Sequence, residues 1–254
     1  DAYYYFTVAK NVATGAGSTF DGATVTTGYH PLWLGVLTAL YYFFDDFKSF
    51  HFAVYGTLTG LFLFGHLLLA RVAIQIGLSL PAFLVGSLIV FVANLSMFQN
   101  GLENNLVFFL LCLFLWMQCR SWQNRTIEIA SSALVLVLIY FARLDGIFFI
   151  MVYLLWYASR EWQAKNIGTA VVLPILVLGV IGGHLLFMLI TFDSIYPTTQ
   201  LAISGFLAEN EASNLLQAFS PREHQLSWRI REVLEWAGLP ANTAPSGPYR
   251  YIGL

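Results

Sequence analysis

Charged side chains are scarce in this sequence: Asp, Glu, Lys and Arg make up 10% of the 254 residues, whereas hydrophobic residues make up 58%. A soluble domain carries about 25% charged residues, so the composition excludes an ordinary water-soluble globular protein. No basic stretch stands out and the net charge is −2, which argues against nucleic acid as a partner. The composition is that of an integral membrane protein.

Cysteine is also rare, since only Cys112 and Cys119 occur, both in one apolar stretch. Their spacing is two helical turns, which is too far for a disulfide, so we expect both to pack as small hydrophobic residues. A starting methionine and a signal peptide are absent as well, because the sequence opens at Asp1 in an aromatic run. We therefore expect a preceding helix that this sequence does not contain, and interpret the chain as a fragment.

Long apolar runs, in contrast, recur along the chain. A straight transmembrane helix needs roughly 20 residues, with about 17 as the minimum, and the second, third and seventh runs meet this. The fourth to sixth runs need flanking residues to cross, and the first is short, opens with proline and ends at two aspartates. The runs are Pro31–Phe44, Phe52–Ala70, Leu80–Phe98, Leu106–Cys119, Ile127–Ala142, Ile147–Tyr157 and Gly168–Phe192.

Basic residues occupy the connections after the second, fourth and sixth runs. The positive-inside tendency places these three connections in the cytoplasm, so the alternate connections face outward. The first run then fits better as a helix that re-enters or lies along the membrane surface than as a crossing. The basic residues are Arg71, Arg120, Arg125, Arg160 and Lys165.

These patterns predict an all-α protein of the plasma membrane with about six transmembrane helices and one membrane-surface or re-entrant helix. Residues 1–50 are expected to form the first external loop, with a short helix near Ala2–Ala13, and residues 51–192 the helical bundle. The more polar residues 193–254 are expected to form an external, partly soluble segment with an amphipathic helix over 213–237.

The N-terminal loop combines one acid with a cluster of glycines. Asp1 precedes a run of aromatic residues, and Gly15, Gly17 and Gly22 are expected to end the short helix in a tight loop. This is not a phosphate-binding loop, because no Lys-Ser or Lys-Thr follows the glycines. An ordinary connecting loop remains the alternative for these residues taken alone.

Three further ionisable residues, Glu103, Arg143 and Asp145, stand at ends of apolar runs. The alternative for Glu103 is a solvated acid in a turn. The alternative for Arg143 and Asp145 is that they form an ion pair with each other. The charge-derived topology places all three on the external face with Asp1, and ionisable residues in such positions mark functional sites. A carboxylate beside a cation suits a lipid-phosphate substrate, because the acid activates a hydroxyl and the cation receives the departing phosphate.

His30 stands at the entry to the first run and is a candidate contact for phosphate, with a packed loop histidine as the alternative. No cluster of His, Cys and Asp has the spacing of a zinc site, so no metal ligands are predicted.

Five segments together resemble the GT-C membrane glycosyltransferases, in particular the bacterial branch related to arabinofuranosyl- and mannosyltransferases. The resemblance covers roughly residues 1–205, and its N-terminal part is the most specific. Two departures concern Leu102-Glu103-Asn104, where relatives often have Met-Glu-Thr, and Tyr196–Phe206, which lacks the lysine that relatives tend to carry. The segments are Asp1–Phe6, Gly15–Phe20, Thr27–Trp33, Asn100–Glu103 and Arg143–Gly146.

The resemblance implies an enzyme that transfers a sugar from a polyprenyl-phosphate donor to a glycan, lipid or protein acceptor on the external face. Asp1 matches the second of two adjacent acids in the family's first external loop and would be the base of a single inverting displacement. Glu103 would be the second catalytic acid. Some family members use a divalent ion, so an ion between Asp1 and Glu103 stays open. Substrate and donor phosphate would be bound by Arg143, Asp145, His30 and Tyr29.

Two other functions compete with this prediction. A transporter or flippase of lipid-linked sugars would place ionisable groups near the bilayer midplane, whereas these acids stand at the ends of the runs. An inactive scaffold related to the family is the third option. The enzyme hypothesis requires Asp1, Glu103 and Arg143 to meet in one external cavity, and well-separated positions would favour its two rivals.

Overall fold

The computed structural model describes residues 2–98 and 101–192, except for the side chains of residues 93–98. Within these ranges the chain is helical and forms no strand, and the one extended pairing is an isolated bridge between Thr19 and Val25. The predicted all-α class is confirmed for this part of the chain. Asp1 and the segment 193–254, with its predicted helix over 213–237, lie outside the described residues.

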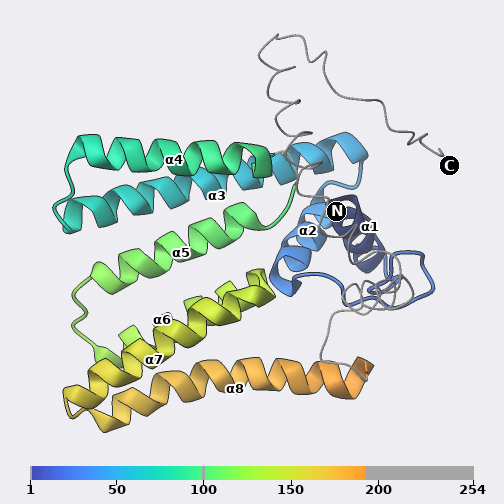
Figure 1. The fold of residues 1–254 in the computed structure, drawn as a ribbon. Coiled ribbons are helices and arrows are strands. Elements are labelled where there is room, and N and C mark those ends of the chain that lie inside the picture. The colour runs from blue at the N-terminus through green and yellow to red at the C-terminus, as the bar shows by residue number, and fades with distance from the viewer. Residues whose placement is uncertain (1, 99–100, 193–254) are drawn as a thin grey trace, which may run out of the picture. The chain divides into compact units, whose positions relative to one another are not determined.

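Each of the seven apolar runs corresponds to one helix (Figure 1). The short helix near the N-terminus, α1, covers Ala2–Ala13 as predicted, and a single 3-10 turn, η1 (Leu144–Gly146), joins the sixth and seventh helices. The remaining helices are α2 (Pro31–Phe43), α3 (Phe47–Gln75), α4 (Leu80–Phe98), α5 (Asn104–Cys119), α6 (Arg125–Ala142), α7 (Ile147–Gln163) and α8 (Ile167–Phe192).

Three of the described helices, α3, α6 and α8, are long and apolar enough to cross a membrane. The 13 residues of α2 extend about 20 Å at 1.5 Å per residue, which is less than the roughly 30 Å of a hydrocarbon core. This length agrees with the predicted non-spanning role of α2. Crossing by α4, α5 and α7, and with it the total of six spans, stays a prediction.

Apolar side chains are exposed on the long helices as well as buried between them. Only 28% of the most apolar window of α3 and 22% of that of α8 is buried. Water-soluble proteins rarely expose apolar surface on this scale, and lipid tails would cover it without cost. The exposed faces are therefore consistent with association with a lipid bilayer.

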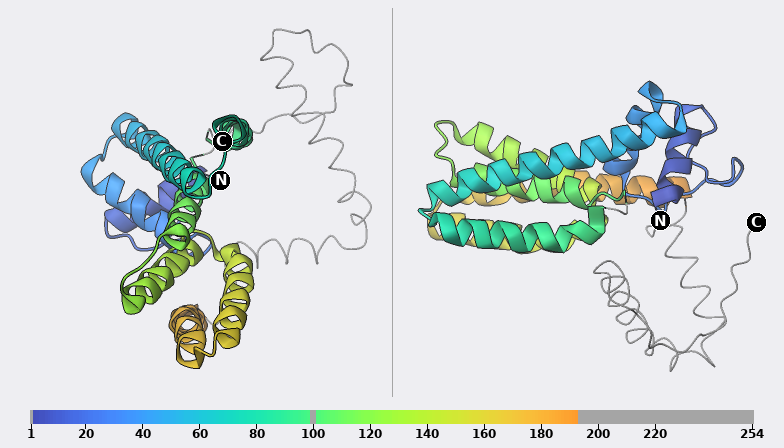
Figure 2. Two further views of the ribbon diagram at one scale, coloured as in Figure 1. Left: turned by 90° about the vertical axis from the view of Figure 1, so that its left-hand side faces the viewer. Right: turned by 90° about the horizontal axis from the view of Figure 1, so that it is seen from above.

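The helices pack in a chain of neighbours that brings α2 and α6 together. α5 packs against α3 on one side and α6 on the other, and α8 packs against α6 and α7 (Figures 1 and 2). α1 lies against α2, which in turn contacts α6. Fully buried residues from several of these helices form the core, among them Trp33, Leu58, Leu136, Ile150 and Leu173.

The glycine loop after α1 has the conformation that the sequence predicts. Gly15, Gly17 and Gly22 have φ angles of 84°, 78° and 80°, in the left-handed region that other residues rarely adopt. The amide of Asn11 in α1 donates to the carbonyl oxygen of Thr19 at 2.9 Å. The loop is thus folded back onto the helix that it follows.

Close packing of α3 on α5 depends on Gly65. A Cβ atom at this position would stand 2.6 Å from Cε1 of Phe108, whereas one at Gly60 of the same helix would meet nothing within 4 Å. We expect Gly65→Ala to lower the free energy of unfolding by about 1–3 kcal/mol through overpacking. Gly60→Ala, the matched control, should be neutral or stabilising by up to about 1 kcal/mol. Denaturant titration in micelles measures both, and equal effects would contradict this account of the contact.

Candidate functional site

Four separate parts of the chain meet around His30, the residue that precedes α2. Its Nε2 lies 3.5 Å from Oε1 of Glu103, the residue that precedes α5. Its Nδ1 accepts a hydrogen bond from the backbone N–H of Leu144 at 3.3 Å, in the turn after α6. Its own backbone N–H donates to the hydroxyl of Tyr5 in α1 at 3.2 Å. The structure therefore brings together predicted site residues that lie more than 70 positions apart in the sequence.

Glu103 is buried in this cluster, with 5% of its surface exposed. Its side chain does not cap α5, and its Oε2 atom has no hydrogen-bond partner among the described residues. Glu103 is thus not a solvated acid in a turn. Because burying a carboxylate without full pairing costs free energy, Glu103 is a candidate functional residue.

Arg143 is bound to two neighbours. Its Nε donates to both carboxylate oxygens of Asp145, at 2.9 and 3.1 Å, and its Nη1 donates to Oδ1 of Asn104 at 2.8 Å. The Arg143–Asp145 pair that the sequence left as an alternative is therefore formed. The bond to Asn104 also fixes the turn after α6 to the first residue of α5.

The charge balance of the described cluster is negative when His30 is neutral, because the cluster contains one guanidinium, that of Arg143, and the two carboxylates of Glu103 and Asp145. Burial lowers the pKa of His30, and the nearby charge of Arg143 lowers it further, while the Glu103 carboxylate opposes both. The described residues of the cluster thus suit hydroxyl donors better than a bare phosphate.

Two members of the cluster, Tyr5 and Asn104, were not predicted as site residues. Burial and the charge of Glu103 raise the pKa of Tyr5, so its hydroxyl stays protonated. The ring of Tyr5 is stacked on that of His30, with 6.4 Å between their centres. Tyr5 stands in a run of three tyrosines, and the sequence holds no signal that separates it from Tyr3 and Tyr4.

The hydrogen bonds assign different tautomers to the histidines. A backbone N–H donates to Nδ1 of His30, so the ring proton of His30 is on Nε2. Nδ1 of His51, in contrast, lies 2.6 Å from the carbonyl oxygen of Phe47 and must carry a proton. We expect two-bond ¹⁵N–¹H spectra at neutral pH to show these opposite tautomers, with His66 resembling His51. A shared tautomer for His30 and His51 would contradict the bond from Leu144.

One further predicted residue, Tyr29, lies outside this set of contacts. The hydroxyl of Tyr29 binds Ser18 of the glycine loop at 2.7 Å, and its side chain lines a mainly apolar groove of about 580 Å³ along α2. Asp1 lies outside the described residues. Its neighbour in the chain, Ala2, lies beside Gly101, since a Cβ on that glycine would stand 3.3 Å from Cβ of Ala2.

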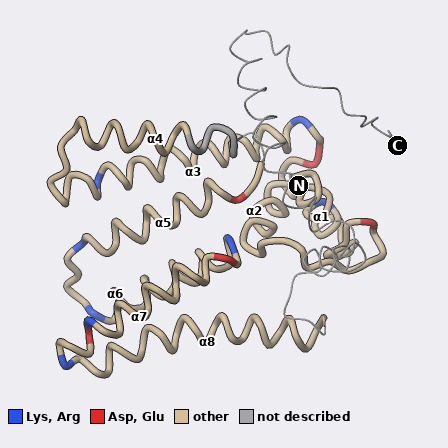
Figure 3. The backbone as a smooth tube through the Cα atoms, in the orientation of Figure 1, with Lys and Arg blue, Asp and Glu red and all other residues tan. Residues whose placement is uncertain are grey.

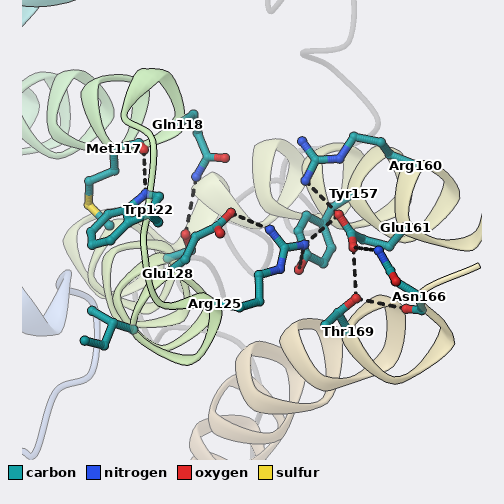
Figure 4. Close-up of polar contacts among 12 residues, drawn as sticks. Met117, Gln118, Trp122, Arg125, Glu128, Tyr157, Arg160, Glu161, Asn166 and Thr169 are labelled. Carbon is teal, nitrogen blue, oxygen red and sulfur yellow. Dashed lines mark hydrogen bonds and ion pairs between the residues drawn. The ribbon is translucent and has the colours of Figure 1, made fainter. Parts of the chain in front are cut away.

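A second polar cluster, which the sequence did not predict, joins α6, α7 and α8 around Glu161, whose surface is 4% exposed (Figure 4). Its Oε1 accepts from Arg125 at 2.6 Å and from Arg160 at 2.8 Å, and its Oε2 accepts from Thr169 at 2.9 Å. Although burial acts to raise the pKa of Glu161, hydrogen bonds from Arg160, Arg125 and Thr169 lower it to about 2. This cluster is a structural link between three helices.

The two clusters lie at opposite helix ends, and charged residues are concentrated at such ends (Figure 3). Arg125 and Arg160 stand where α6 begins and α7 ends, whereas Arg143 and Asp145 stand in the connection between these helices.

Among the described residues, no group of three or more His, Cys, Asp or Glu side chains could hold a metal ion. Comparison with known proteins finds no match to this chain among protein-family models, curated proteins or solved structures.

Proposed function

We propose that this chain is a membrane glycosyltransferase that transfers a sugar from a polyprenyl-phosphate donor to a hydroxyl of a glycan, lipid or protein acceptor. The observation that carries the proposal is the buried carboxylate of Glu103, which keeps one oxygen without a partner among the described residues and lies beside His30. An acid held in this state can accept the proton or hydrogen bond of a hydroxyl. The resemblance to GT-C enzymes supplies the donor class.

In the proposed reaction Asp1 removes the proton of the acceptor hydroxyl. The hydroxyl oxygen then attacks the anomeric carbon, the bond to the polyprenyl phosphate breaks, and the phosphate leaves with the electron pair. Glu103 orients the acceptor hydroxyl through its Oε2 atom. Asp145 and Asn104 hold the guanidinium of Arg143, which faces the developing negative charge of the phosphate.

The net negative charge around Glu103 means that too little positive charge is present to neutralise the phosphate. Arg143 alone does not neutralise Glu103 and Asp145 together with a phosphate, so the proposal requires a further cation. A basic residue of 193–254 or a divalent ion near Asp1 would supply it. Titration of turnover with EDTA and Mg²⁺ separates these two sources, because only the second responds to chelation.

The proposed orientation places the Glu103 cluster outside and the Glu161 cluster in the cytoplasm. It rests on the positive-inside tendency and on basic residues near one end of the helices. These are Arg71 inside α3 near its end, Arg120 and Arg125 where α5 ends and α6 begins, and Arg160 and Lys165 where α7 ends. Six helices, α3 to α8, then cross the plasma membrane, and α2 lies at its outer surface.

The test is turnover of the full-length protein, reconstituted in liposomes, with a panel of polyprenyl-phosphate sugars. We expect transfer from at least one donor, and Asp1→Asn to reduce it by about 100-fold or more, the usual size of general-base catalysis. Normal transfer by Asp1→Asn would overturn the assignment of the base. Uptake or flipping of a lipid-linked sugar without transfer would favour the transporter hypothesis instead.

A further inference from the structure

A groove of about 360 Å³ lies between α1, the end of α2 and the start of α3, apart from the Glu103 cluster. Phe6 and Phe50 line it and are buried, whereas Tyr3 and Phe47 line it with 69% and 68% of their surface exposed. The groove therefore offers aromatic rings with free surface. Such rings can pack against the C–H groups of a ligand.

His51 presents an unused hydrogen-bond acceptor in this groove. Its Nδ1 lies 2.6 Å from the carbonyl oxygen of Phe47, and a carbonyl oxygen only accepts, so Nδ1 carries a proton. In the neutral imidazole Nε2 then carries the lone pair. Nε2 is buried and has no hydrogen-bond partner among the described residues. A buried acceptor left in this state is costly, and a ligand hydroxyl would satisfy it once a covering side chain moves aside.

The charged residues of the groove cancel each other. Lys10 and Asp45 both line it, and neither side chain has an ion pair or hydrogen bond within the described part of the chain. With one positive and one negative side chain, the groove favours neither an anionic nor a cationic ligand. A neutral ligand whose groups both donate and accept hydrogen bonds suits both residues.

We propose that this groove binds a neutral sugar unit. One sugar hydroxyl donates to Nε2 of His51, further hydroxyls bind Lys10 and Asp45, and the C–H face of the ring packs on Phe47. The volume of about 360 Å³ is near the lower end of the roughly 300–1,000 Å³ of small-molecule pockets, as expected for a small ligand.

Sugar binding here does not depend on the proposed glycosyl transfer. If both proposals hold, the groove is placed to receive an acceptor, because Phe6 also lies against Gly101, two residues before Glu103. A Cβ on that glycine would stand 3.0 Å from Cζ of Phe6.

The test is saturation-transfer NMR on the full-length protein in lipid nanodiscs, without glucoside detergents, which carry sugars themselves. The probes are methyl α-mannopyranoside and methyl β-galactopyranoside. We expect saturation of the ring protons of at least one glycoside and a Kd that rises at least about 5-fold in His51→Phe, the effect of one lost hydrogen bond. Phe47→Leu should also weaken binding. Because Phe47 is exposed, misfolding of this variant would not explain the weaker binding.

His66→Phe is the matched control. Nδ1 of His66 also lies near a carbonyl oxygen four residues earlier, at 3.0 Å, and its Nε2 is also buried without a partner among the described residues, but His66 does not line this groove. We expect an unchanged Kd. Equal weakening by both histidine variants, or no saturation of either glycoside by the unmodified protein, would overturn the proposal. Glycoside binding without any sugar transfer would overturn only the proposed function.

Discussion

Glu103→Gln is expected to lower kcat/KM for sugar transfer by about 100-fold or more while leaving the stability of the protein unchanged or higher. Glutamine keeps the shape of the side chain but removes the negative charge that orients the acceptor hydroxyl. A buried amide is also less costly than a buried carboxylate with an unpaired oxygen. Turnover in liposomes and denaturant titration in micelles measure the two effects.

A purely structural Glu103 would behave differently, because its replacement would lower stability and activity together. The control is Asp46→Asn, which makes the same change of an acid to an amide outside the cluster. Asp46 caps α3 by accepting from the backbone N–H of Ser49 at 3.0 Å, and asparagine caps helices about as well as aspartate. Asp46→Asn should retain activity. Equal activity of both variants would remove Glu103 from the proposed mechanism.

Glu161→Gln is expected to lower the free energy of unfolding by about 2–4 kcal/mol. The variant removes the charge shared by Arg125 and Arg160 and weakens the link from α7 to α6 and α8. The value lies near the low end for a buried ion pair because the two arginine side chains are 39% and 44% exposed and stay partly hydrated. Denaturant titration in micelles at neutral pH measures the loss.

The contribution of Glu161 to the free energy of unfolding should also depend on pH. Its pKa is about 2 in the folded protein and 4.5 ordinarily, so its contribution to stability is complete above about pH 4.5 and is lost as the pH falls toward 2. Glu161→Gln should lack this part of the acid dependence. Glu128→Gln is the control, because Arg125, at i,i+3, is the only ion-pair partner of Glu128 within residues 2–98 and 101–192. This variant should cost less than about 1 kcal/mol. Similar losses of stability in both variants would contradict the assignment of Glu161 as the acid that links the three helices.

The helices could be predicted because their signals are local. A long apolar run bounded by charges or proline must form a helix in lipid, where every backbone N–H and C=O group needs an internal partner. This explains why the run Leu80–Phe98 became α4 with the same bounds. Glycine likewise predicted the loop after α1, because Gly15, Gly17 and Gly22 adopt backbone angles that few other residues tolerate.

The contacts of the candidate site could be predicted only in part. Charge alternation predicted that Glu103 and Arg143 share one face, but not that Glu103 is buried beside His30 while Arg143 is held by Asn104. These contacts join residues far apart in the chain, and their distances depend on how α2, α5 and α6 pack. Tyr5 shows the same limit, since its neighbours in sequence are also tyrosines.

Hydrophobicity and glycine act within one segment, so the all-α class, the positions of the helices and the helix end near each charged residue could be predicted from the sequence alone. Tertiary packing, in contrast, controls which charges are buried. It bound Arg143 to Asn104, placed Oε1 of Glu103 next to His30 while Oε2 has no partner among the described residues, and brought Arg125 to Glu161. The cost of a buried charge depends on its neighbours from other helices, and no single segment of the chain contains them.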